Sequence, residues 1–188
     1  MVELEYQIHQ LLKPFCDTAL VGDASIVKNF SGYEYGIDHY LEIGEYFITI
    51  QDKWENKNPS IRDINHFIVP TTDIESRNSK KFLCGIFASR MPFTKRGVKI
   101  FDSQNKRYTN KMYFNIVCEA SIEALAITTR DFVLKRLTML GIVPIKTCDT
   151  VWSLRKHQLE TVDTFNDKYL SDGVNTGIVC HPTVQEKQ

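Results

Sequence analysis

The segment GIDHYLEIGEYFITIQDKW, residues 36–54, has the alternating pattern of a β-hairpin, yet it carries polar residues at its open end. Gly44-Glu45 predicts a two-residue turn, and Gly at the first central position favours type II′. Counting outward from this turn places Asp38 directly opposite Gln51. The segment therefore predicts two half-buried strands with a group of polar side chains where they end.

The two faces of this hairpin differ in polarity, because side chains alternate along a strand. One face carries Asp38, Tyr40, Glu42, Phe47, Thr49, Gln51 and Lys53. The other carries Leu41, Ile43, Tyr46, Ile48, Ile50 and Trp54, and we expect it to be the core side. Asp52 also falls on the apolar face, which we attribute to exposure at the strand end. His39 falls there too and is expected to be a packed histidine rather than a base.

Asp38, Gln51 and Lys53 share a face, and directly opposed Cβ atoms lie about 4.5–5.5 Å apart. A carboxylate, an amide oxygen and the backbone carbonyl of Asp52 are oxygen donors of the kind that hard divalent cations prefer. Lys53 could orient an attacking water or stabilise developing negative charge. The group thus indicates metal-assisted phosphodiester hydrolysis. The alternative is a surface ion pair between Asp38 and Lys53 with Gln51 beside it.

The chain has no net charge, but its charges are unevenly distributed. Residues 1–45 contain eight acids and two bases, whereas residues 77–111 contain ten bases and one acid. A basic block inside a folded domain indicates a phosphate-binding surface. A solvated loop and helix face would explain the same pattern.

The elements predicted along the chain are a helix over 3–15, a strand over 25–31, the hairpin, a helix capped by Ser60, a strand over 81–89, a short helix from Thr94, a strand over 112–120 and a helix over 121–142. In the last of these helices the apolar stripe is Ile122, Leu125, Ala126, Val133, Leu137 and Leu140. This order predicts an α/β fold with a central mixed sheet flanked by helices.

A chain of 188 residues, 43% of them hydrophobic, suits a single domain, residues 1–188. We expect a core over about 1–145 and an extension over 146–188, with a helix near 153–169 and a mobile tail. No apolar run has the length of a membrane span, and the acidic start does not resemble a signal peptide. The five widely spaced cysteines indicate reduced thiols. The sequence predicts a soluble intracellular protein, in cytoplasm or nucleus, without a membrane partner.

The hairpin resembles the active-site hairpin of the PD-(D/E)xK nuclease superfamily, most closely its Mrr-like restriction endonuclease branch. The matching residues are Gly36-Ile37-Asp38 and Gln51-Asp52-Lys53. Downstream, IRDINHFI is similar to the helix after the catalytic strand, and GIFASRMPFTKRGVKIF to the next strand and the segment that follows it. The resemblance covers about residues 3–140.

This resemblance implies a restriction-endonuclease-like core and a deoxyribonuclease that uses Mg²⁺ or Mn²⁺. It implies that Asp38 and Gln51 bind the metal and that Lys53 is the catalytic lysine. Glu5 is a further candidate ligand, with Glu3 and Glu34 as alternatives. Arg90, Lys95, Arg96, Lys99, Lys106 and Arg107 are candidates for contacts with the DNA backbone. Cutting both strands of a duplex would favour a homodimer.

Two other interpretations remain open. The chain could be a nuclease-fold module that binds nucleic acid or acts as a scaffold without turnover, or an unrelated α/β interaction protein. The presence of Asp38, Gln51 and Lys53 together favours the nuclease, because a site that has lost activity commonly loses its lysine or aspartate. Endonuclease versus exonuclease activity, DNA versus RNA and the preferred nucleic-acid structure are not distinguished by the sequence.

Overall fold

The computed structural model describes residues 3–22, 25–26, 36–110 and 112–142. Five strands form one mixed sheet in the order of the chain. They are β1 (Thr18–Val21), β2 (His39–Ile43), β3 (Tyr46–Lys53), β4 (Lys81–Ser89) and β5 (Tyr113–Val117). β2 runs antiparallel to both β1 and β3, whereas β3, β4 and β5 are parallel to one another. The chain is therefore α/β with a mixed sheet, as predicted.

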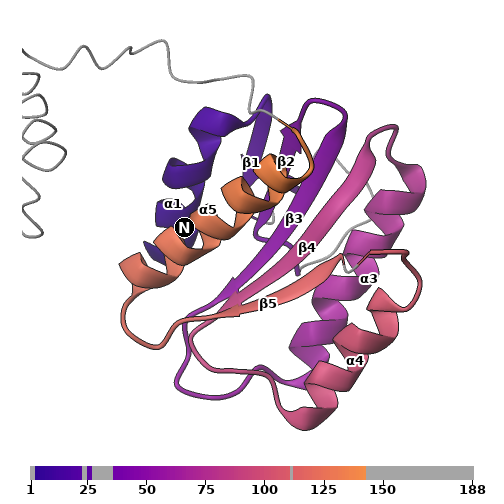
Figure 1. The fold of residues 1–188 in the computed structure, drawn as a ribbon. Helices are drawn as coiled ribbons and strands as arrows, with labels where there is room; N and C mark the ends of the chain where they lie inside the picture. Colours follow the sequence, from indigo (N-terminus) through magenta and orange to yellow (C-terminus); the bar gives the residue numbers. More distant parts are fainter. Residues whose placement is uncertain (1–2, 23–24, 27–35, 111, 143–188) are drawn as a thin grey trace, which may run out of the picture. The chain divides into compact units, whose positions relative to one another are not determined.

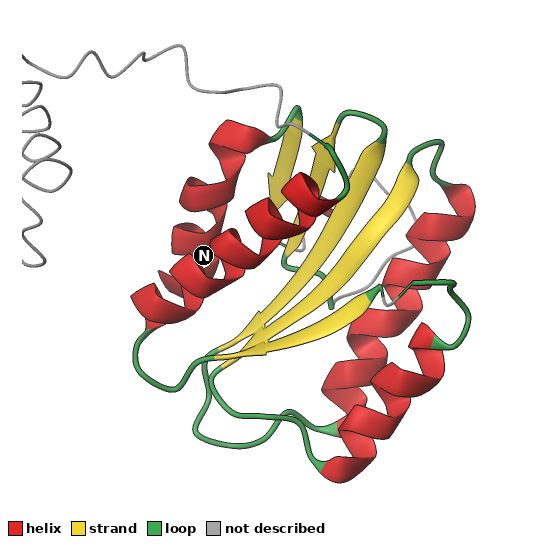
Figure 2. Ribbon diagram, in the orientation of Figure 1, coloured by secondary structure: helices red, strands yellow, loops and turns green. Residues whose placement is uncertain are grey.

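Helices cover both faces of this sheet (Figures 1 and 2). The helices are α1 (Glu3–Leu12), followed by a 3₁₀ turn (Lys13–Phe15), α3 (Ile61–Arg77), α4 (Lys95–Asn105) and α5 (Ile122–Met139). α1 and α5 pack on one face and α3 and α4 on the other. The parallel strands are joined by helices, because a parallel connection must return along the full length of the sheet.

Because helices cover both faces of the sheet, the prediction that only one face of the hairpin is a core side was wrong. Leu41, Ile43, Ile48 and Ile50 pack under α1 and α5, as expected. Tyr40 and Phe47, on the face expected to be polar, are also buried, in the aromatic-rich core beneath α3 and α4. Strands that are covered on both sides lose the apolar and polar alternation of a half-exposed hairpin.

Most predicted elements are present, with ends that shift by a few residues. Ser60, Thr94 and Ser121 cap α3, α4 and α5 through their side chains. The first strand was predicted wrongly: β1 lies at Thr18–Val21, and Ser25 and Ile26 are helical. Residues 27–31 of that prediction lie outside the described residues. Leu140, predicted in the apolar stripe of the last helix, is 46% exposed because α5 ends at Met139.

Gly36 lies against α3 in a contact that leaves no room for a side chain. Its φ is +122°, and a Cβ at this position would overlap the carbonyl oxygen of His66. Pro70 lies four residues after His66 and has no N–H to bond that carbonyl. The proline thus leaves free the carbonyl against which Gly36 packs, two residues before Asp38.

The chain divides into two compact units, residues 1–147 and 148–188, and all described residues belong to the first. The helix predicted near 153–169 and the tail lie outside the described residues. Among the helices that the structure describes, none combines the length and apolar character needed to cross a membrane. Cys16 and Cys84 are buried free thiols, and Cys118 is a half-buried one.

Candidate active site

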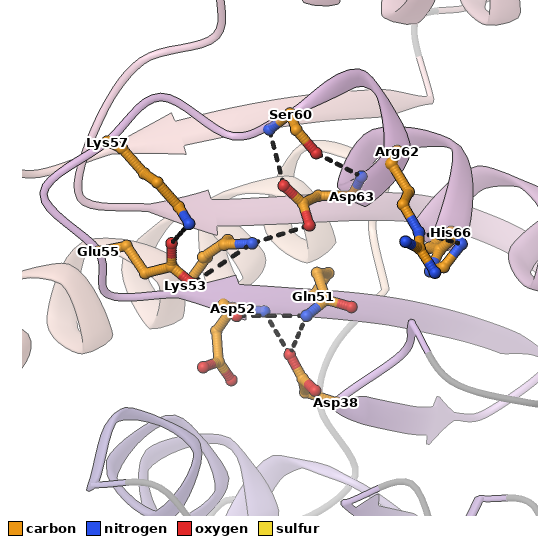
Figure 3. A network of polar contacts seen from close by, with 10 residues as sticks. All are labelled: Asp38, Gln51, Asp52, Lys53, Glu55, Lys57, Ser60, Arg62, Asp63 and His66. Atoms are coloured by element: carbon orange, nitrogen blue, oxygen red, sulfur yellow. Dashed lines mark hydrogen bonds and ion pairs between the residues drawn. The ribbon is translucent and has the colours of Figure 1, made fainter.

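The candidate site lies at the carboxyl end of β3, where β2 begins. The pairing of β2 with β3 joins Ile43 to Tyr46 and Tyr40 to Thr49, which is the predicted register. Gly44 takes a φ of +57° in the turn. Asp38 immediately precedes β2, and Gln51, Asp52 and Lys53 are the last three residues of β3. The two strands thus bring all four residues to one end of the sheet (Figure 3).

Asp38 is held by two donors from β3. Its Oδ2 accepts a 2.6 Å hydrogen bond from Nε2 of Gln51 and a 2.7 Å bond from the backbone N–H of Asp52. The Asp38 residue is only 9% exposed. The predicted proximity of Asp38 and Gln51 is therefore confirmed, and the backbone of Asp52 takes part as well.

Three of the four predicted metal ligands, Asp38, Gln51 and the backbone carbonyl of Asp52, lie together at the end of β3. Nε2 of Gln51 lies 3.3 Å from the backbone carbonyl oxygen of Asp52 and donates to Asp38. The amide oxygen of Gln51 points away from Asp38 (Figure 3), so the amide has to rotate before this oxygen can join a shared ion. No group of three or more His, Cys, Asp or Glu side chains within residues 3–22, 25–26, 36–110 and 112–142 is arranged to hold a metal.

Lys53 points towards the start of α3 rather than along the strand (Figure 3). Its Nζ lies 2.8 Å from Oδ1 of Asp63 and 3.5 Å from Oε1 of Glu55. Burial alone would lower the pKa of Lys53, but the two carboxylates outweigh it and raise the pKa above its usual value. Lys53 therefore carries a full positive charge beside Gln51 at neutral pH.

Asp63 serves two partners with its two oxygens. Oδ2 accepts a 2.7 Å bond from the backbone N–H of Ser60, and the backbone N–H of Asp63 donates to the Ser60 hydroxyl. The cap at Ser60 was predicted from the sequence, and Asp63 completes it as a capping box. Burial would raise the pKa of Asp63, but the bonds from Lys53 and Ser60 hold it at about 2. The contact of Oδ1 with Lys53 was not predicted, because nothing in the local pattern joins a helix cap to the preceding strand.

His39 and Asp52 form a buried pair on the opposite side of the sheet from Lys53. Nε2 of His39 lies 2.9 Å from Oδ2 of Asp52, and the two side chains are 0% and 5% exposed. The expectation that His39 is packed is confirmed, but the attribution of Asp52 to strand-end exposure is wrong. A buried polar side chain requires a hydrogen-bond partner. The sequence placed His39 and Asp52 on the same apolar face, so their pairing could have been predicted.

Burial favours the uncharged forms of this pair. It lowers the pKa of His39 and raises the pKa of Asp52 from their usual values. Glu5 raises the pKa of both groups, so this α1 residue lies near them. Glu5 is half-buried on the α1 side, whereas Glu3 is exposed at the start of α1 and Glu34 lies outside the described residues.

The candidate DNA-binding residues separate into two groups. Arg90 follows β4, and its backbone N–H bonds the carbonyl of Lys53. Its guanidinium lies 5.0 Å from the centre of the Trp54 ring and donates to Asn56. The remaining candidates are exposed on α4 or just after it: Lys95, Arg96, Lys99, Lys106 and Arg107.

α4 points away from the site, so its two ends lie at different distances from it. The loop before α4 contacts the loop after β3 through a 2.7 Å bond from Asn58 to the carbonyl of Pro92. Lys95 and Arg96 open the helix at this end. Lys106 and Arg107 follow the other end, before β5. At about 1.5 Å per residue, a helix of 11 residues is about 16 Å long.

Part of the basic block is neutralised within the fold. Lys80 lies 3.7 Å from Glu42, and Lys81 lies 3.0 Å from Glu45, both at the hairpin turn. These acids come from the acidic amino-terminal part of the sequence. Ion pairs within the fold therefore account for part of the uneven charge distribution. Arg90, after β4, and Lys95 and Arg96, at the start of α4, are the candidate bases at the site end of the sheet.

Comparisons of this chain with known protein families, with curated proteins and with solved structures find no match. The fold and the geometry of the site therefore carry the functional argument.

Proposed function

We propose that the protein is a metal-dependent deoxyribonuclease with a restriction-endonuclease-like core that hydrolyses phosphodiester bonds at the Asp38, Gln51 and Lys53 site. The observation that carries the proposal is the 2.6 Å contact between Asp38 and Gln51, with the charged Lys53 on the same strand face as Gln51. A carboxylate, an amide oxygen and a cation at the end of two paired strands match the resemblance to the PD-(D/E)xK hairpin.

These oxygen donors suit a magnesium ion whose remaining coordination positions are taken by phosphate oxygens and water. Asp38 supplies a carboxylate, Gln51 an amide oxygen after rotation, and Asp52 a backbone carbonyl. Mg²⁺ often takes one or two carboxylates from the protein and completes its octahedron with phosphate oxygens and water. A Mg²⁺ or Mn²⁺ ion held there would polarise the phosphate and lower the pKa of a coordinated water.

The protein's own groups supply position and charge. Asp38 is fixed by the amide of Gln51 and the backbone of Asp52, so its carboxylate needs little reorganisation. Lys53 provides a positive charge for the negative charge that develops on the phosphate. Arg90, whose backbone is bonded to that of Lys53, supplies a second cation at the same end of the sheet.

The test is cleavage of labelled linear, supercoiled, single-stranded and branched DNA with Mg²⁺ or Mn²⁺. Asp38→Asn keeps an acceptor for Gln51 but loses the charge, and Lys53→Ala removes the cation. We expect each to lower the cleavage rate at least about 100-fold. Lys135→Ala is the matched control, because Lys135 is exposed on α5, on the opposite face of the sheet from Lys53.

The proposal fails if the wild-type protein cuts none of these DNAs, or if the Asp38 and Lys53 variants cut as fast as the control. The oligomeric state, measured by light scattering with and without duplex DNA, tests the homodimer that double-strand cutting favours.

A nuclease-fold module that binds nucleic acid without cutting it is the second candidate. Two observations favour it: Lys53 is engaged by Asp63 and Glu55, and the NH₂ group of Gln51, not its oxygen, faces Asp38. Wild-type protein that binds DNA in a gel-shift assay but leaves it intact with either metal would support this function.

A further inference from the structure

Asp63 contacts the candidate site although it belongs to the start of α3. Its carboxylate joins Lys53, at the end of β3, to Ser60, which caps the helix. Residues 54–60 between these two elements form a loop, so the ion pair is a direct connection between strand and helix.

The cap alone does not require Lys53. One carboxylate oxygen, Oδ2, accepts the bond from the Ser60 backbone, and the reciprocal bond runs from Asp63 N–H to the Ser60 hydroxyl. The other oxygen, Oδ1, is directed at Nζ of Lys53 at 2.8 Å. A lysine has four rotatable side-chain bonds, and an unanchored one samples many rotamers. The bond from the Ser60 backbone N–H to Oδ2 orients the Asp63 carboxylate, and Oδ1 holds the lysine.

We propose that Asp63 is a positioning residue of the candidate site, which holds the ammonium group of Lys53 on the Gln51 side of the sheet so that it is in place before a phosphate binds. This inference rests on the proposed function for its catalytic meaning, but the anchoring of Lys53 is a property of the protein alone. It also assigns Asp63 a role beyond its part in the α3 capping box.

Four variants separate anchoring from capping. Asp63→Asn keeps an oxygen for the Ser60 N–H but removes the charge that holds Lys53. Asp63→Glu keeps both the charge and the usual capping-box residue. Ser60→Ala removes one bond of the cap and leaves the Lys53 contact untouched. Glu55→Gln removes the longer, 3.5 Å partner of Lys53.

The first readout needs no DNA and no metal. Nuclear relaxation of the ¹⁵N-labelled lysine ammonium groups in EDTA reports how ordered Nζ of Lys53 is, with Lys135, which is exposed on α5, as an internal reference. We expect Lys53 to be more ordered than Lys135 in wild type and to become as mobile as Lys135 in Asp63→Asn. Asp63→Glu and Ser60→Ala should keep Lys53 ordered, and Glu55→Gln should have a smaller effect than Asp63→Asn.

The second readout is the cleavage reaction. Asp63→Asn should lower kcat about 10- to 100-fold, because a small displacement of a catalytic group has an effect of this size, with little change in KM. Asp63→Glu should recover most of kcat. Ser60→Ala should lower the thermal midpoint while leaving kcat close to wild type at 20 °C, which separates positioning from folding.

The outcomes distinguish the two proposals. Equal order of Lys53 in wild type and Asp63→Asn overturns the positioning role, whatever the DNA assay shows. An equal loss of kcat in Ser60→Ala and Asp63→Asn also overturns it, since capping would then account for both. Release of Lys53 in Asp63→Asn supports the anchoring, and if it comes with a wild-type protein that cuts no DNA, only the nuclease proposal falls.

Discussion

Asp52 makes contacts on both faces of the sheet. Its backbone N–H donates to Asp38 in the candidate site, and its side chain pairs with His39 on the far side. His39 in turn directly follows Asp38 in the chain. The buried pair therefore lies behind the site and fixes the two strand ends that carry Asp38, Gln51 and Lys53. A change at Asp52 is expected to affect folding first and the site second.

Asp52→Ala should destabilise the protein by about 1–3 kcal/mol, because it leaves the uncharged His39 buried without its hydrogen-bond partner. The other ring nitrogen of His39, Nδ1, already has no hydrogen-bond partner among the described residues. Asp52→Asn should cost less, since an amide can still bond Nε2. Urea unfolding of metal-free protein measures both.

Asp73→Ala is the matched control for that measurement. Asp73 pairs with Arg77 across one helical turn of α3, in an exposed salt bridge of 3.1 Å. Such pairs contribute about 0–1 kcal/mol. A loss of stability in Asp73→Ala as large as that in Asp52→Ala would contradict the argument that burial gives the His39 pair its importance.

At the scale of elements, the site depends on how closely α3 approaches the start of β2. A proline inside a helix is expected to end or kink it, yet α3 continues from Ile61 through Pro70 to Arg77. The carbonyl of His66, which Pro70 cannot bond, is where Gly36 packs. The contact between Gly36 and α3 fixes the path of the chain just before β2, where Asp38 contacts Gln51 and Asp52 of β3.

Gly36→Ala should be far more damaging than Gly44→Ala. Both glycines have positive φ, so both substitutions carry a backbone cost of about 1–2 kcal/mol. A Cβ at Gly44 meets nothing within 4 Å, whereas a Cβ at Gly36 overlaps the backbone of α3. We expect Gly36→Ala to lose at least twice the free energy of unfolding lost by Gly44→Ala, measured by urea denaturation. Equal losses would mean that α3 can move aside.

In the described unit as a whole, the candidate site lies at one end of the sheet and the β2–β3 hairpin turn lies at the opposite end. The ends of β3 and β4, the start of β2 and the start of α4 share one end. The hairpin turn lies at the other, where Lys80 and Lys81 meet Glu42 and Glu45. Basic residues can assist the proposed nuclease only if they lie at the site end.

The double variant Lys95→Glu and Arg96→Glu should therefore weaken DNA binding more than Lys106→Glu and Arg107→Glu. The two variants change the net charge equally, but the ends of α4 are about 16 Å apart, twice the screening length of about 8 Å at 0.15 M salt. The first variant should reduce the slope of log affinity against log salt by about 2.

Gel-shift titrations at several salt concentrations measure these slopes. Equal weakening by the two double variants would show that DNA does not bind preferentially at the site end. It would then favour a diffuse attraction to the basic α4 face over a path across the ends of β3 and β4.

The amino-acid sequence by itself determined the hairpin register, the helix cap at Ser60, the helix starts near Thr94 and Ser121, and the approach of Asp38 to Gln51. Each of these depends on neighbours a few residues apart or on a single tight turn, where alternation and capping chemistry are decisive. β1 was missed because its four half-buried residues give too short a pattern to recognise.

Only the tertiary structure decided which partners the polar residues take. Lys53 bonds Asp63 rather than standing free beside Asp38, and His39 holds Asp52, because α3 and α1 cover opposite sides of the same strand ends. α4 likewise divides one basic stretch of sequence between two ends of the sheet. A sequence pattern gives the face and spacing of a side chain, but the groups that face it come from distant segments, and their positions follow from packing.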